Sequence, residues 1–169
     1  MASSAKIGNM PPRRRAAVAE RITLDSNVLV YAFDNTEPVK QPIAMELLWL
    51  AHDRGSVLAT NAVGEFYWVM VRKAKVAPLK AHGHLRDLIT LFPIAGYGTD
   101  ALEAAALAVA GGRFEFWDAI ILATAEEAGC TICFSEDMQD GARFGNLVVR
   151  NPFGENGLSQ AARTALNLP

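Results

Sequence analysis

Short apolar segments alternate with helical patterns along most of this chain, and this alternation constrains its fold more than any other feature. Strands are predicted at residues 21–24, 56–59, 92–95, 131–134 and 146–149. Helices are predicted at residues 28–33, 38–54, 61–75, 78–91, 100–110 and 118–128. Because neighbouring parallel strands are joined by crossover helices, this order predicts an α/β layer fold with a mainly parallel sheet.

Length and composition are those of one domain with a sizeable core. The 169 residues, 51% of them apolar, can bury enough surface without a disulfide or a structural metal. The pattern divides the chain into a flexible basic N-terminal arm (1–20), a folded domain (21–150) and a C-terminal tail (151–169). No uncharged apolar run reaches the roughly 18 residues of a membrane span, and no signal-peptide pattern is present. We therefore expect a cytoplasmic protein with no membrane segment.

Charge is distributed unevenly along the chain. Residues 1–21 carry five of the 16 basic side chains and one of the 18 acidic ones, which leaves residues 22–169 with a net charge of −6. Such an acidic body is a poor general binder of nucleic acid, so cations must mask part of the acid if the substrate is a polyanion. Cys130 and Cys133 lie in an apolar strand with their side chains on opposite faces, which predicts buried free thiols.

Four carboxylates stand close to the predicted strand ends. Asp25 directly follows the first strand, Glu65 lies in the second turn of the helix after the second strand, Asp118 opens the helix 118–128, and Asp137 follows the strand 131–134. Open α/β sheets bind ligands at the carboxyl ends of their strands, so these groups can converge. Each alone has an ordinary interpretation as a helix cap, a solvated helix residue or a turn residue.

The surroundings of two of these carboxylates favour a site. Glu65 is the only charge among residues 63–71, and Asp118 stands between aromatic and aliphatic residues, where an unpaired carboxylate is costly. Clustered carboxylates repel one another unless protons or cations neutralise them, and oxygen ligands favour Mg²⁺ or Mn²⁺. Such an ion lowers the pKa of bound water and stabilises charge in phosphodiester hydrolysis.

Four blocks of the sequence together resemble the PIN-domain ribonucleases, and among them the VapC-type toxins of bacterial toxin–antitoxin pairs. The blocks are Leu24–Asp34, Glu65–Phe66, Trp117–Ala125 and Ser135–Gly141, which occur in the family's order within about residues 21–150. The resemblance implies a three-layer α/β/α sandwich in a PIN-like nuclease domain. It also implies a metal-binding set made of Asp25, Glu65, Asp118 and Asp137, supported by Asn27 and Ser135, with Glu136 or Asp140 as alternatives to Asp137.

The resemblance further implies a function. We expect a Mg²⁺- or Mn²⁺-dependent endoribonuclease that hydrolyses RNA with a metal-activated water and leaves a 5′-phosphate and a 3′-hydroxyl. It implies a homodimer and a small antitoxin protein that blocks the site. Two alternatives remain open: a non-catalytic PIN-fold binding module, and a phosphotransfer enzyme of the haloacid-dehalogenase type. The second lacks the Asp expected two residues after Asp25, where this chain has Asn27.

Overall fold

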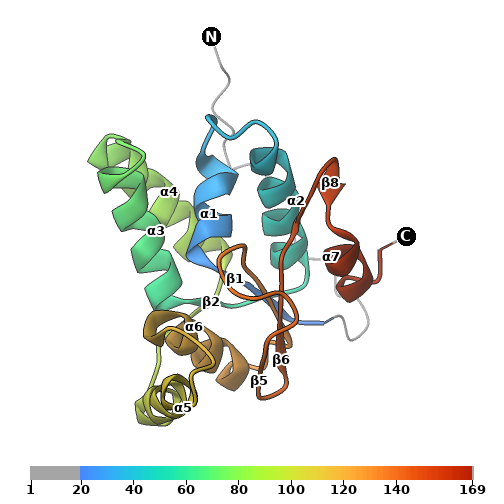
Figure 1. Ribbon diagram of the computed structural model, residues 1–169. Coiled ribbons are helices and arrows are strands. Elements are labelled where there is room, and N and C mark those ends of the chain that lie inside the picture. Colours follow the sequence, from blue (N-terminus) through green and yellow to red (C-terminus); the bar gives the residue numbers. More distant parts are fainter. Residues whose placement is uncertain (1–19, 169) are drawn as a thin grey trace.

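The computed structural model describes residues 20–168, arranged as helices on both sides of a small sheet (Figure 1). The arm predicted at residues 1–20 lies, except for Glu20, outside the described residues. Three parallel strands, β1 (Ile22–Leu24), β4 (Ile132–Phe134) and β6 (Leu147–Arg150), form the centre of the sheet, and β5 (Arg143–Phe144) pairs antiparallel at its edge. The mainly parallel sheet predicted from the sequence is therefore confirmed.

A second parallel pair extends this layer beside β1. It consists of β2 (Leu58–Ala59) and β3 (Ile94–Ala95), paired from Leu58 opposite Ile94. The backbone N–H of Ile22 donates to the Ser56 hydroxyl, 3.2 Å away, just before β2 begins. The strand predicted at residues 92–95 is therefore present, but only Ile94 and Ala95, which follow Pro93, pair with β2.

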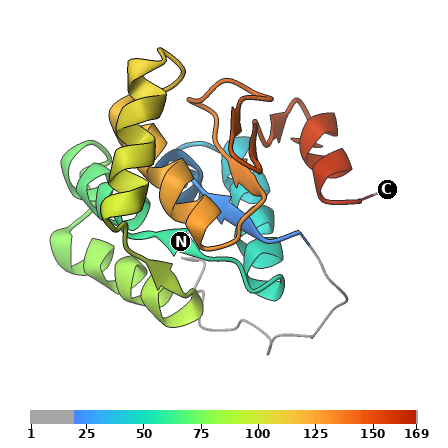
Figure 2. The same cartoon turned by 90° about the horizontal axis from the view of Figure 1, so that it is seen from below.

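Six helices lie between β1 and β4 in chain order. They are α1 (Ser26–Phe33), α2 (Lys40–Asp53), α3 (Thr60–Arg72), α4 (Pro78–Leu91), α5 (Thr99–Ala110) and α6 (Phe116–Glu127). Proline opens α4 at its first position, where the missing N–H has no helical partner to lose. Figure 2 shows α3 and α4 side by side and α5 against α6, with α7 (Gln160–Ala165) at the opposite end of the molecule from α5.

Alternation along the strands produces the three layers. Ile132 and Phe134 of β4 belong to the apolar cluster formed with α1 to α4, whereas Cys133 between them belongs to the cluster formed with α5 and α6. Complete burial of a large aliphatic or aromatic side chain contributes about 1.5–3 kcal/mol to stability. A register slip of one residue in β4 would move each of its side chains to the opposite face of the sheet, so it would cost much of this free energy. This two-sided burial confirms the α/β/α sandwich. Both cysteines are free and buried, as expected, but Cys130 lies before β4 and packs in the same cluster as Cys133, so the prediction that they face opposite sides of the sheet was wrong.

Residues 151–168, expected from the sequence as a tail, hold regular structure. A hairpin of β7 (Phe153–Gly154) and β8 (Gly157–Leu158) leads into α7. Leu158, Ala162 and Leu166 recur every four residues and are buried in the cluster that contains α2. Arg54 at the end of α2 donates to the backbone carbonyl of Leu166, 2.7 Å away. This segment therefore completes one face of the core.

A membrane-spanning helix is absent from the described residues. Among residues 20–168, no helix combines the length and the apolar character needed to cross a bilayer.

Candidate functional site

Asp25 is fixed at the junction between β1 and α1. It caps α1, and its Oδ1 accepts a hydrogen bond from the Ser26 N–H at 2.6 Å. Its Oδ2 accepts from the Asn27 amide at 2.9 Å and from the Ser135 hydroxyl at 2.6 Å. Only 4% of the residue is exposed. Burial raises the pKa of Asp25, and the hydrogen bonds from Ser135 and Ser26 oppose this shift without cancelling it.

Ser135 connects Asp25 to the loop that follows β4. Because β1 and β4 are parallel neighbours, with Leu24 opposite Phe134, the residues after both strands emerge at the same edge of the sheet. The Ser135 hydroxyl also accepts from the backbone N–H groups of Asp137 and Met138 at 3.2 and 3.3 Å. It therefore orders the turn that presents Asp137. Asn27 and Ser135, the two supporting residues expected from the sequence, both contact Asp25.

Glu65 reaches the same region from α3, but in a different environment from the one expected. It is exposed, and its Oε2 accepts a hydrogen bond from the Ser26 hydroxyl at 3.0 Å. The apolar residues Val63, Phe66 and Met70 are buried on other sides of the helix. The apolar setting expected for Glu65 was wrong, because the apolar run in the sequence wraps around a helix that is only partly covered.

Asp118 lies in the first turn of α6 and is half-buried. Burial, together with the negative charges of Asp25, Glu65 and Asp137, raises its pKa to about 6. All four carboxylates predicted from the sequence therefore lie close enough to share one electrostatic centre. This centre forms from four separate parts of the chain.

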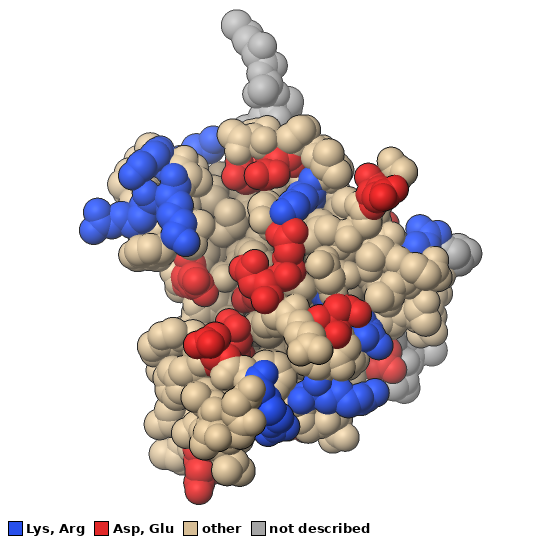
Figure 3. Space-filling view, in the orientation of Figure 1, with Lys and Arg blue, Asp and Glu red and all other residues tan. Residues whose placement is uncertain are grey.

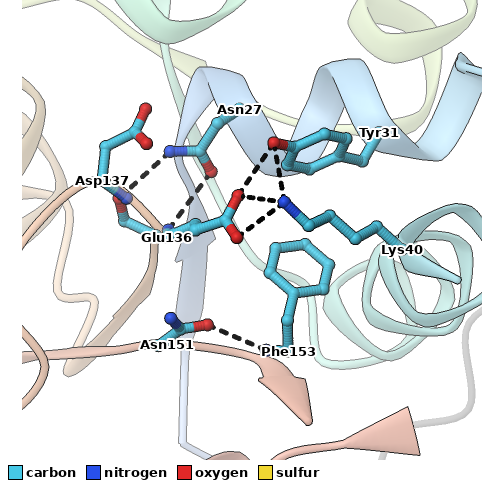
Figure 4. A network of polar contacts seen from close by, with 8 residues as sticks. Asn27, Tyr31, Lys40, Glu136, Asp137, Asn151 and Phe153 are labelled. Atoms are coloured by element: carbon cyan, nitrogen blue, oxygen red, sulfur yellow. Dashed lines mark hydrogen bonds and ion pairs between the residues drawn. The ribbon is translucent and has the colours of Figure 1, made fainter. Parts of the chain in front are cut away.

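The two alternatives to Asp137 are engaged elsewhere. Glu136 forms an ion pair with Lys40 at 2.7 Å and accepts a hydrogen bond from the Tyr31 hydroxyl at 2.8 Å, on the side of the loop away from the Asp137 carboxylate (Figure 4). Asp140 lies 3.7 Å from Arg150 and accepts from the backbone N–H of Asn151. Of the three acidic residues Glu136, Asp137 and Asp140, only Asp137 acts electrostatically on both Asp25 and Asp118.

A cleft opens beside this centre. It has a volume of about 380 Å³ and is lined by Asp118 and Asp137 together with Arg113, Glu115 and Met138. Figure 3 shows acidic side chains gathered around the hollowed middle of this face. A larger hollow of about 630 Å³ lies between β6 and α7, but Glu20 is the only acidic residue among its lining residues. The carboxylate chemistry therefore belongs to the smaller cleft.

Sequence reasoning missed two residues of this site. Glu115 lines the cleft and contributes to the raised pKa of Asp118, which stands one helical turn later. The three-residue spacing from Asp118 was the available signal. Ser26, which follows Asp25 at the start of α1, donates its hydroxyl to Glu65. No pattern in the sequence indicates this contact.

The donor set fits a divalent cation by its chemistry. Four carboxylates supply hard oxygen ligands, and within residues 20–168 none of them forms an ion pair with a basic side chain. Among the same residues, no group of three or more His, Cys, Asp or Glu side chains lies close enough together to hold a metal ion as it stands. The centre thus has the charge that attracts a cation, in an open arrangement.

The raised pKa of Asp118 predicts a stability change with pH when metal is chelated. In the folded protein Asp118 keeps its proton up to about pH 6, whereas in the unfolded chain it loses it near pH 3.8. Raising the pH through this window therefore destabilises the wild type, and Asp118→Asn lacks this loss. We expect the variant to gain about 1 kcal/mol relative to wild type between pH 4 and pH 7, a value reduced by solvent screening. Urea unfolding in EDTA at both pH values measures it, and parallel pH profiles would contradict the shared centre.

Fold and site together define an α/β protein with a carboxylate centre at the carboxyl ends of parallel strands. The chain belongs to the PIN domain family, whose model matches residues 22–142. None of the curated proteins compared with the chain matches it.

Solved structures of toxin–antitoxin proteins share this fold. One is VapC20 of Mycobacterium tuberculosis, described as a toxin that cleaves the sarcin–ricin loop, with 17% identity, a TM-score of 0.56, and coverage of 75% of this chain and 98% of that one. The DNA-bound VapBC of Salmonella typhimurium has 17% identity, a TM-score of 0.59 and coverage of 78% and 97%. FitAcB of Neisseria gonorrhoeae has 21% identity, a TM-score of 0.56 and coverage of 78% and 97%. At these identities the likeness shows a common fold.

Proposed function

We propose that this protein is a Mg²⁺- or Mn²⁺-dependent endoribonuclease, the toxin of a toxin–antitoxin pair, that hydrolyses RNA phosphodiester bonds in the cytoplasm. The observation that carries the proposal is the grouping of Asp25, Glu65, Asp118 and Asp137, in which burial and the repulsion of the neighbouring carboxylates together raise the pKa of Asp118 to about 6. Membership of the PIN domain family and the likeness to VapC20, a toxin that cleaves RNA, support it.

The four carboxylates are the residues that would hold the ion. Mg²⁺ keeps several of its waters and needs only one or two direct carboxylate ligands, which suits an open centre. Asp25 is rigidly held by three hydrogen bonds, and Asp118 faces the cleft. When bound, the ion would activate water for attack on the phosphodiester and stabilise the developing negative charge.

In this scheme, neighbouring side chains position two of the carboxylates, and the pH determines whether a third, Asp118, is ionised. Ser135 and Asn27 hold Asp25 in place, and Ser26 holds Glu65, so these two carboxylates keep their positions without a bound substrate. Asp118 is sensitive to protonation near neutral pH, because its pKa is raised to about 6. A nearby cation favours its ionised form.

RNA needs positive charge outside this acidic centre. Arg72, Lys73, Lys75 and Lys80 are exposed at the end of α3 and the beginning of α4, and basic side chains gather there in Figure 3. We assign to this basic patch (residues 72–80) the contacts with RNA phosphates, which would make binding weaken as salt is raised.

An antitoxin and a second copy of the chain are the proposed protein partners. A solved toxin–antitoxin complex from Klebsiella pneumoniae is similar to this chain, with 21% identity, a TM-score of 0.55 and coverage of 78% of this chain and 98% of that one, and it supports a small antitoxin here. Large apolar side chains are exposed on α3 to α6, among them Trp68 (52%), Leu79 (83%), Leu107 (71%) and Trp117 (59%). Exposed apolar groups of this size are typical of surfaces that bind another protein.

Removal of metal tests the proposal directly. Purified protein, freed of any antitoxin, is incubated with cellular RNA in Mg²⁺, in Mn²⁺ and in EDTA, and fragments are separated by electrophoresis. We expect cleavage with either ion and none in EDTA, with activity restored when Mg²⁺ is added back. Folded protein that binds Mn²⁺ and cuts no RNA would contradict the nuclease and favour the non-catalytic binding module.

A further inference from the structure

A closed polar network stands at the rim of the acidic centre and is not part of it. Lys40, at the beginning of α2, donates to Glu136 at 2.7 Å and to the Tyr31 hydroxyl at 3.1 Å. Tyr31 in turn donates to Glu136 at 2.8 Å. The three side chains therefore satisfy one another, and they come from α1, α2 and the loop after β4 (Figure 4).

Aromatic rings enclose this network. The Lys40 ammonium lies 4.5 Å from the centre of the Tyr31 ring and 5.6 Å from that of Phe153, at the start of β7. The two rings pack edge to face with their centres 5.3 Å apart. An ammonium held between a carboxylate and two ring faces is well fixed, since each contact is strengthened by partial exclusion of water.

Glu136 is a carboxylate next to the centre that is kept out of it. It stands between Ser135, which donates to Asp25, and Asp137, which belongs to the centre. Its backbone N–H is 3.4 Å from the Asn27 side-chain oxygen, but its carboxylate points the other way, toward Lys40 (Figure 4). Partial burial alone would raise the pKa of Glu136, yet the hydrogen bonds from Lys40 and Tyr31 outweigh it and lower the pKa.

We propose that Lys40 is a positioning residue of the site: by binding Glu136 against Tyr31 and Phe153, it withholds a fifth carboxylate from the acidic centre. A released Glu136 would face the same cation and the same RNA phosphates as Asp137, one residue away. It would compete for ligation and repel the substrate, because four carboxylates already repel one another there. The inference rests on the nuclease proposed above.

The C-terminal segment takes part in this arrangement. The Phe153 N–H donates to the Asn151 side chain at 2.9 Å, and the Asn151 N–H donates to Asp140 at 2.9 Å. The ring that covers Lys40 therefore comes from a segment beyond the match to the PIN domain model, which ends at residue 142, and this segment is anchored to Asp140 within the match. The hairpin of β7 and β8 thus supports the site as well as the core.

Rescue of one variant by a second substitution tests the inference. Lys40→Met releases Glu136, and we expect kcat for RNA cleavage to fall about tenfold, in the range found for residues that orient metal ligands. Lys40→Met combined with Glu136→Gln has the same net charge as the wild type and no free carboxylate, so cleavage recovers to within about threefold. Lys40→Arg keeps the ion pair and serves as the conservative control. Circular dichroism establishes that each variant is folded.

Binding of Mn²⁺, measured by calorimetry without RNA, provides a readout that does not depend on cleavage. Lys40→Met is expected to bind Mn²⁺ more tightly than wild type, because one more carboxylate is available, and the double variant returns to the wild-type affinity. The inference is overturned if Lys40→Met cleaves like the wild type, if the double variant is as slow as the single one, or if Mn²⁺ binding weakens in Lys40→Met. A wild type that neither cuts RNA nor binds Mn²⁺ would instead overturn the proposed function.

Discussion

We expect the Asp118→Asn protein to fold like the wild type and to cleave RNA about a thousandfold more slowly. Asp118 lines the cleft and interacts electrostatically with the other three carboxylates, so the substitution removes one full charge from the place where a cation would be held. Metal ions contribute several kcal/mol to such reactions, and each 1.36 kcal/mol is a factor of ten in rate. Single-turnover cleavage at saturating Mg²⁺ measures the loss.

A matched control separates this effect from a general loss of negative charge. Glu127 ends the same helix, is exposed, and does not line the cleft. Glu127→Gln therefore makes the same chemical change on α6 and is expected to cleave at the wild-type rate. Full activity of Asp118→Asn, in protein shown to be free of contaminating nuclease, would remove the carboxylate centre from the mechanism.

The part of the site nearest the sheet was predictable from the sequence. A short apolar strand that ends in Asp25-Ser26-Asn27 requires a sharp change from strand to helix, and the same reasoning places residue 135 at the end of a neighbouring strand. Parallel strands bring such residues to one edge of the sheet. Local sequence patterns were therefore sufficient to predict that Asp25 and the residues after the strand 131–134 lie at the same edge of the sheet.

Features that depend on which side of a helix is covered were not predictable in this way. The apolar run around Glu65 gave a false picture of its burial, because the helix α3 is only partly covered by its neighbours. The pairing of Lys40 with Glu136 joins residues 96 positions apart, and no local pattern selects it. The C-terminal segment was interpreted as a tail because it is rich in Gly, Asn and Ser, although Leu158, Ala162 and Leu166 are buried.

Stability, rather than activity alone, distinguishes Asp25 from Asp118. We expect Asp25→Ala to lower the free energy of unfolding by about 2 kcal/mol or more at pH 7 in EDTA. Loss of a helix cap costs about 1 kcal/mol, and the buried Ser135 hydroxyl loses its acceptor, which costs about 1–3 kcal/mol more. Removing a buried charge from a repulsive cluster offsets part of this loss, since burial already raises the pKa of Asp25.

The balance between these opposing effects can be measured by comparing Asp25→Ala with Asp25→Asn. Asparagine keeps an oxygen that can accept from the Ser26 N–H, so it retains the cap while removing the charge. Urea unfolding of both variants should therefore find Asp25→Asn the more stable, with neither variant cleaving RNA. An alanine variant as stable as the wild type would mean that repulsion within the centre outweighs the hydrogen bonds of Asp25. The carboxylate would then be present for its chemistry alone and would add nothing to the fold.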